Sequence, residues 1–190
     1  MPNTTRRSYI AALLAGSVIS LSGCADTTEE KTTEEYNVQI TSTAENVEYS
    51  AEMTQPLSGQ KSEPLAMEIT LQNTSDKQIL YGDQRDAFFS YETSSDAYGL
   101  YAESSIPRSS YAYNSEKQQW ELTESLVRTT DFQTATLNPQ EYITQSVILL
   151  HLQTEKEQNS IPSSLQFTNQ LQITVESEQE WITNILTLAQ

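Results

Sequence analysis

The stretch that decides the fold is LAMEITLQNTSD, residues 65–76. Its apolar residues recur at every second position, at Leu65, Met67, Ile69 and Leu71. This alternation predicts a β-strand with one buried face. The polar run at 73–76 favours a turn, because short polar side chains hydrogen-bond to nearby backbone groups. This stretch therefore predicts one half-buried strand followed by a tight turn, and the rest of the chain is compared with this pattern.

The same pattern recurs along most of the chain. Strands are expected at 36–40, 47–51, 65–71, 78–81, 87–92, 98–102, from Trp120 onward, 131–137, 142–152, 165–167, 171–175 and 181–188. Residues 147–150 are apolar on both faces, which predicts a central strand. Residues 181–188 also suit one face of a short helix, but Thr183 and Thr187 favour a strand. Many short strands with frequent turns indicate an all-β fold, an antiparallel β-sandwich over 36–190.

Two regions are expected to lack this regularity. Residues 103–117 are predicted to form an irregular segment. Residues 25–35, ADTTEEKTTEE, contain no large apolar side chain and predict a solvated tether.

The first 24 residues indicate export and a lipid anchor. Arg6 and Arg7 precede a mildly apolar run at 10–21, too short for a membrane-spanning helix of about 20 residues. The layout is typical of a signal peptide, and the arginine pair resembles a twin-arginine export motif. Leu21-Ser22-Gly23-Cys24 resembles a lipobox, in which the cysteine thiol takes the lipid. We expect a signal peptide at 1–23, lipidated Cys24 with the tether at 24–35, and attachment to the extracellular face of the cell membrane.

The composition is strongly acidic. The net charge of −16 becomes −18 once the two positive charges of Arg6 and Arg7 are removed with the signal peptide. Such a surface repels nucleic acid, so no nucleic-acid partner is expected. Abundant acids with scarce lysine are typical of proteins adapted to very high salt, where screening weakens self-repulsion. Cys24 is the only cysteine, so the mature domain has no disulfide and no thiolate metal site.

Two internal motifs carry a family resemblance. The stretch 71–76 resembles the L-x-N-T-x-D signature of extracellular immunoglobulin-like domains, and 137–141 resembles their L-x-P-G-E corner, with Gln140 in place of the glycine. With the export signal, the chain resembles lipoproteins of halophilic archaea that carry one such domain. That family has no assigned activity, so the resemblance implies anchoring and fold. A more distant likeness is to the intracellular proteinase inhibitor of bacilli.

Residues with catalytic or metal-binding chemistry are sparse. His151 is the only histidine and follows an apolar run, which favours a strand residue over a catalytic base. Asp83 and Asp86 flank Arg85 and could bind calcium, but close acidic pairs arise by chance in a chain with 26 acids. No catalytic residue, metal or cofactor is predicted.

Two further features concern recognition. Nine of the sixteen aromatic residues lie between 81 and 120, and Tyr111 and Tyr113 in the irregular segment are the expected exposed ligand surface. The alternative is that most of these rings fill the core. Asn73 begins the triplet Asn73-Thr74-Ser75, the glycosylation acceptor of the mature chain.

The sequence thus predicts a membrane-anchored lipoprotein with a non-catalytic domain that binds a protein or glycan partner at the cell surface. Two alternatives stay open. A proteinase inhibitor would need an exposed rigid loop, for which 103–117 is the candidate. An enzyme would need a nucleophile beside a base.

Overall fold

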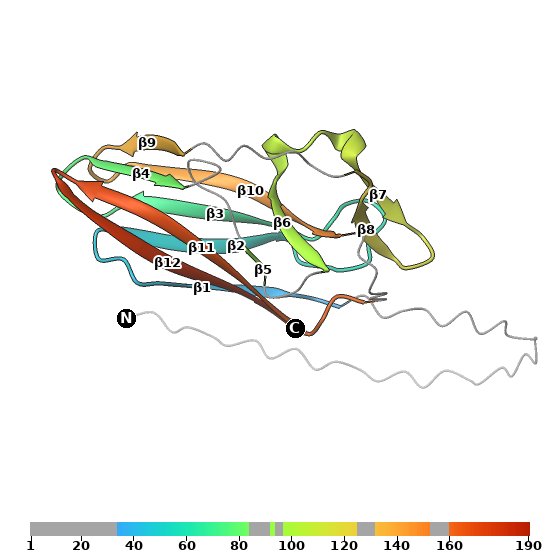
Figure 1. Ribbon diagram of the computed structural model, residues 1–190. Helices are drawn as coiled ribbons and strands as arrows, with labels where there is room; N and C mark the ends of the chain where they lie inside the picture. Colours follow the sequence, from blue (N-terminus) through green and yellow to red (C-terminus); the bar gives the residue numbers. More distant parts are fainter. Residues whose placement is uncertain (1–33, 84–91, 94–96, 125–131, 153–159) are drawn as a thin grey trace, which may run out of the picture. The chain divides into compact units, whose positions relative to one another are not determined.

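The predicted strand segments that the structure describes form β-strands in a computed structural model (Figure 1). The structure describes residues 34–83, 92–93, 97–124, 132–152 and 160–190, which belong to one compact unit, Thr32–Gln190. The predictions on Arg6, Arg7, Cys24, Asp86 and strand residues 87–91 lie outside the described residues. Among those described, no helix is long and apolar enough to cross a membrane.

The first sheet has the strand order β1–β12–β11–β4–β9, and β5 pairs with β11. Its strands are β1 (Asn37–Ser42), β4 (Ile79–Asp83), β5 (Glu92–Thr93), β9 (Gln133–Leu137), β11 (Ser164–Val175) and β12 (Glu178–Ala189). All its pairings are antiparallel. The long β11–β12 hairpin forms its middle (Figure 1). The segments 165–167 and 171–175, predicted as separate strands, are one strand, and 181–188 is strand as predicted.

The second sheet has the order β2–β3–β10–β8–β7, and β6 pairs with β10. Its strands are β2 (Val47–Gln55), β3 (Ala66–Asn73), β6 (Tyr98–Ala102), β7 (Tyr111–Asn114), β8 (Gln119–Leu122) and β10 (Tyr142–His151). The pairing of β10 with β8, at His151 and Glu121, is parallel, and the others are antiparallel. The expected irregular segment 103–117 instead contains two 3-10 turns, η1 (Glu103–Ser105) and η2 (Arg108–Ser110), and strand β7.

The inner faces of the two sheets enclose the main core. Its largest fully buried members are Tyr36, Met67, Ile69, Leu71, Ile79, Tyr98, Phe167, Leu171 and Ile182. Apart from Tyr36, which directly precedes β1, these residues come from strands of both sheets and occupy alternate positions, because successive side chains of a strand point to opposite faces. The predicted all-β sandwich is therefore confirmed.

A second core lies on the outer face of the second sheet. It contains Ile106, Tyr111, Trp120, Leu122, Ile148 and Leu150. Val147 and Leu149 of β10 face the main core, whereas Ile148 and Leu150 of the same strand face the second core. This explains why residues 147–150 are apolar on both faces, and the predicted central position of their strand is confirmed.

The two motifs that carry the family resemblance meet at one corner. The backbone N–H of Asn73 donates to the carbonyl of Glu141 (2.9 Å), and the N–H of Gln140 donates to the carbonyl of Asn73 (3.0 Å). Gln140 has φ of 64°, the left-handed conformation that glycine adopts without steric cost. Residue 140 therefore has the backbone conformation typical of glycine, although it is a glutamine.

The folded domain begins slightly before the predicted boundary. Glu34 and Glu35 were assigned to the tether, but the N–H of Ser58 donates to the carbonyl of Glu34 (2.9 Å) and Glu35 forms a β-bridge with Leu57. The hydroxyl of Tyr36 then donates to the 161–162 loop, within 3.1 Å of both carbonyl oxygens. The last two residues of the expected tether thus belong to the sandwich.

Candidate functional site

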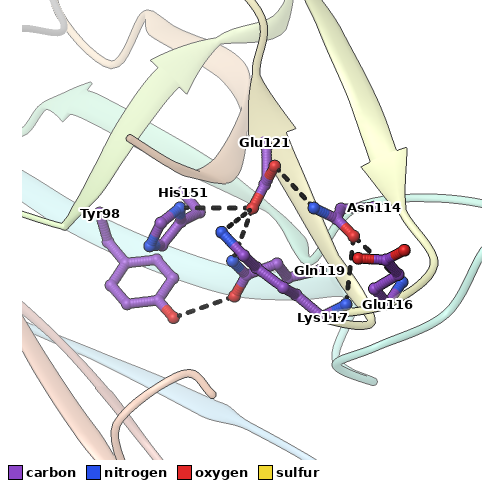
Figure 2. Close-up of polar contacts among 7 residues, drawn as sticks. All are labelled: Tyr98, Asn114, Glu116, Lys117, Gln119, Glu121 and His151. Carbon is purple, nitrogen blue, oxygen red and sulfur yellow. Dashed lines mark hydrogen bonds and ion pairs between the residues drawn. The ribbon is translucent and has the colours of Figure 1, made fainter. Parts of the chain in front are cut away.

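A cluster of polar side chains closes one end of the main core (Figure 2). Strand β8 places Gln119 and Glu121 beside His151, the last residue of β10, and β6 contributes Tyr98. Gln119 and His151 are almost fully buried and Glu121 is 9% exposed. Charged and amide groups are seldom this buried without partners, so each needs to be accounted for.

The carboxylate of Glu121 accepts hydrogen bonds from two amide side chains and lies beside an ammonium group. Its Oε1 accepts from Gln119 (2.9 Å) and lies 3.2 Å from the ammonium of Lys117, and its Oε2 accepts from Asn114 (3.0 Å). Burial by itself raises the pKa of this carboxyl, but the bonds from Asn114, Gln119 and Lys117 outweigh it, so the pKa is lowered. Glu121 is therefore a carboxylate at neutral pH.

His151, in contrast to Glu121, is buried without hydrogen bonds to its ring nitrogens from the described residues. Its Nδ1 lies 3.8 Å from Oε1 of Glu121, and among the described residues neither ring nitrogen has a hydrogen-bond partner. Tyr98 packs edge-on against the imidazole, with ring centroids 5.1 Å apart. Burial lowers the pKa of His151 more than the Glu121 charge raises it, and Lys117 lowers it further. The imidazole is therefore neutral at pH 7.

This cluster has the features of a structural support. General-base catalysis requires the imidazole to contact a nucleophile, and no described hydroxyl hydrogen-bonds to His151. The adjoining cavity, lined by Tyr98, Gln119, Trp120 and His151 among others, is about 20 Å³, room for a single water. Oδ1 of Asn114 accepts from the N–H groups of Glu116 and Lys117, which shapes the β7–β8 turn. Asn114, Lys117 and Gln119, the three partners of Glu121, all belong to this hairpin, so Glu121 holds the hairpin together. The hydroxyl of Tyr98 donates to Gln119 (3.5 Å) and connects the hairpin to β6.

The expectation that Tyr111 is exposed is wrong. Tyr111 is 6% exposed and packs against Trp120, with ring centroids 5.8 Å apart. Tyr113 is partly buried, packs on the same Trp120, and donates its hydroxyl to the carbonyl of Gly59 (2.8 Å). The guanidinium of Arg108 lies over the Tyr111 and Trp120 rings at 4.6 and 4.7 Å. These rings build the second core, because β7 lays them against Trp120 of β8.

A glycan on Asn73 does not fit this fold. The side chain is fully buried, and its Nδ2 donates to the carbonyls of Lys77 (2.7 Å) and Leu137 (3.1 Å). Its Oδ1 accepts from the N–H of Ser75 (3.0 Å). A glycan is attached through the same nitrogen, so modification would displace two bonds that hold the corner. The sequence triplet is a turn signature here and not a free acceptor.

The calcium hypothesis for Asp83 and Asp86 falls outside what the structure describes, since Asp86 is not described and only the backbone of Asp83 is. Among the described residues, no group of three or more His, Cys, Asp or Glu side chains is placed to hold a metal ion.

A second feature lies on the outer face of the first sheet, and we name it the Gln/Thr face. It consists of the outward side chains of Asn37, Gln39, Thr41, Leu80, Gly82, Thr134, Thr136, Gln166, Thr168, Gln170, Gln172, Thr174, Gln179, Trp181, Thr183, Ile185 and Thr187. The register brings them into rows, such as Trp181–Gln172–Gly82–Thr134. None of these side chains is charged, although the chain has 26 acids; β5 of the same sheet pairs Glu92 with Thr168, and only the backbone of Glu92 is described.

An exposed aromatic pair stands on this face. Trp181 is 50% exposed, and Phe132, which directly precedes β9, is 45% exposed. The two rings meet edge to face with centroids 6.3 Å apart. Gly82 makes this placement possible: a Cβ there would lie 2.9 Å from Cε1 of Phe132 and 2.4 Å from the carbonyl oxygen of Gln133. The missing side chain at Gly82 thus lets the Phe132 ring lie close to β4.

Sequence reasoning missed this face. Its signal was present: residues 160–175 contain no charge, and Gln or Thr occupies every second position from 166 to 174. The pairing of Trp181 with Phe132, about fifty residues away, depends on the strand order and leaves no local signal.

Comparison of the chain with known proteins adds no assignment. No protein-family model matches it, and no curated protein matches it. The functional argument therefore depends on the residues and contacts described above.

Proposed function

We propose that the protein is an exported lipoprotein, held on the extracellular face of the cell membrane through lipidated Cys24. Its sandwich, of the immunoglobulin-like type, binds a partner at the cell surface without catalysing a reaction. The anchor is supported by the order of Arg6-Arg7, the apolar run and Leu21-Ser22-Gly23-Cys24 in the first 24 residues.

The observation that carries the binding role is the Gln/Thr face. Charged side chains are the usual means of keeping a surface soluble, and this chain has them in excess. Their absence from the described outward side chains of one sheet, where Trp181 and Phe132 are also exposed, is typical of a recognition surface.

The alternatives have less support. An inhibitor loop at 103–117 would need to project freely, but Ile106, Ser110 and Tyr111 of this segment are buried. An enzyme would need a base beside a nucleophile, and His151 is enclosed between Tyr98 and Glu121 (Figure 2).

The anchor is tested by Cys24→Ser in the producing cells. We expect the variant to lose its partition into the detergent phase of a Triton X-114 extract or to remain unprocessed, because the acyl chains that the thiol carries give the protein its affinity for that phase. Normal processing with unchanged partition into the detergent phase would exclude the lipobox. Replacing Arg6 and Arg7 by lysine is expected to leave precursor in the cytoplasm, and unchanged export would exclude the twin-arginine route.

The binding role is tested by co-sedimentation with envelopes of the producing cells. The full chain carrying Cys24→Ser is expected to sediment with the envelopes, and Gln170→Glu, which places one charge on the Gln/Thr face, is expected to reduce this. Ser50→Glu adds the same charge to an exposed position on the opposite sheet and serves as the matched control. Equal effects of the two charges would contradict a role for this face.

A further inference from the structure

The aromatic pair and the amide and hydroxyl side chains around it form one continuous surface. Trp181 lies beside Gln172 in the register of β11 and β12, and Thr183 lies beside Gln170 in the next outward row. Gln172 is followed across the sheet by Gly82, over which the Phe132 ring lies. Two exposed rings thus adjoin amide and hydroxyl groups, and the described side chains in these rows carry no charge.

This combination restricts the chemistry of a partner. An amide offers donors and acceptors together, and a threonine hydroxyl offers both as well. Sugar hydroxyls match such groups, and the C–H face of a pyranose ring packs on an aromatic ring. Cations would find no carboxylate among the described side chains in the rows of Trp181 and Thr183, and anionic polymers would meet the negative field of the whole chain.

The extent of the face favours a polymer over a single sugar. Five outward residues of β11, from Gln166 to Thr174, alternate with core residues along one line. At about 3.4 Å per residue, this line is roughly 27 Å long. A surface of this length accommodates several linked sugar units.

We infer that the Gln/Thr face binds an uncharged polysaccharide, with pyranose rings packed on Trp181 and Phe132 and hydroxyls bound by Gln172, Gln170 and Thr183. This inference rests on the proposed surface-binding role and specifies its ligand. Uncharged stacking and hydrogen bonding involve no counterion release, so this binding does not weaken as salt increases.

The test is co-sedimentation of the full chain carrying Cys24→Ser with insoluble cellulose, chitin and starch. The protein is kept in a detergent whose head group is not a sugar, so that the detergent does not compete for the site. We expect retention on at least one of them, unchanged between 0.2 and about 2 M NaCl. Trp181→Ala is expected to weaken it at least about tenfold. Tyr142→Ala, which removes the most exposed aromatic ring of the opposite sheet, is the matched control and should leave binding unchanged. Thermal unfolding of each variant checks that it is folded.

Three results would overturn the inference. The first is that the protein binds none of the three polymers, although it still binds envelopes and Gln170→Glu still reduces that binding. The proposed binding role at the cell surface would then remain, with a different ligand. Another is an equal loss of binding in folded Trp181→Ala and Tyr142→Ala. The third is a dimer in sedimentation velocity that Trp181→Ala dissociates, which would assign the face to a second copy of the chain. Loss of the Gln170→Glu effect on envelopes would instead contradict the proposed function itself.

Discussion

The two sheets share the same inner construction and differ on their outer faces. Both alternate apolar residues toward the main core. Outward, the second sheet carries Glu48, Glu52 and Glu68 on β2 and β3, whereas none of the described outward side chains of the first sheet is charged. Exposed outer positions contribute little to core packing, so their chemistry reflects what surrounds the protein more than how it folds. The acidic face suits solvent, and the uncharged face suits a partner.

The second sheet differs in another way, because part of its outer face is itself a core. Ile148 and Leu150 of β10 pack under the 103–114 segment, while outward residues of β11 such as Thr168 are exposed. Outward side chains of β10 therefore stabilise the fold by being buried, whereas outward side chains of β11 are exposed and contribute little to stability.

The largest expected effect tests this difference. Leu150→Ala should lower the free energy of unfolding by about 2–5 kcal/mol, because it removes a fully buried side chain and leaves a cavity. Thr168→Ala on the Gln/Thr face should change it by no more than about 0.5 kcal/mol. Urea denaturation of both variants measures the two values. Similar losses would mean that outward residues of the two sheets are equally important for stability.

The next effect concerns the corner that connects the sheets. Asn73→Ala should cost about 1–3 kcal/mol, because the buried carbonyls of Lys77 and Leu137 lose their donor. Gln140→Gly keeps the corner backbone and should stabilise by about 1 kcal/mol, since it relieves the left-handed conformation. Urea midpoints of both variants give the signs. A destabilising Gln140→Gly would show that the side chain, and not the backbone, maintains this corner.

A smaller effect concerns pH at the end of the second sheet. Burial lowers the pKa of His151 in the folded protein, with Glu121, Lys117 and Tyr98 facing it from β8, the β7–β8 turn and β6. As the pH falls below the unfolded value of about 6.5, the unfolded chain takes up a proton that the folded chain does not. Stability contributed by neutral His151 is therefore complete above that pH and is lost below it.

The measurement is the urea midpoint between pH 7.5 and 5.5. We expect it to fall for the wild-type protein and to fall less for His151→Leu, which has no group to protonate. If the two proteins lose stability in parallel, other groups are responsible for the pH dependence.

The smallest single effect is on the acidic face. Glu52 and Glu68 are direct cross-strand partners on β2 and β3, and both are exposed. Glu52→Gln should stabilise by about 0.2–1 kcal/mol at 0.1 M salt, because like charges in this position repel. The gain should disappear in molar KCl, where the Debye length is about 3 Å.

Differential scanning calorimetry at both salt concentrations checks this, with sucrose as a non-ionic control for salting-out. The wild-type protein should also melt at a lower temperature in 0.1 M salt than in molar salt. A wild-type melting temperature that does not depend on salt would contradict the halophilic interpretation of the acidity.

Much of the fold was accessible from the sequence, because period-two alternation states which side of a strand is buried. The strand at 98–102 has the predicted bounds, β10 agrees with its prediction within one residue at each end, and β3 begins one residue and ends two residues later than predicted. The segment 103–117 was misjudged because its apolar residues Ile106 and Tyr111 are too widely spaced to show a period. They are buried only because the outward side of β10 offers a second apolar surface.

The residues of the proposed recognition surface were harder to predict. Tyr111 and Tyr113 were chosen for their type and setting, and both serve packing. Trp181 and Phe132 were assigned to strands without a role, since a strand pattern does not say which neighbours its outer side chains have. Their contact requires β12, β11, β4 and β9 to be adjacent.

The sequence by itself determined the alternation of buried and exposed positions, the turns and the acidic composition, because each depends on residues close together in the chain. Only the tertiary structure decided that Asn73 is enclosed at a corner, that β10 has apolar neighbours on both sides, and that the uncharged positions of five strands form one face. These properties depend on which strands become neighbours. Which strands become neighbours depends on the sum of many long-range contacts, and no short segment of the sequence predicts that sum.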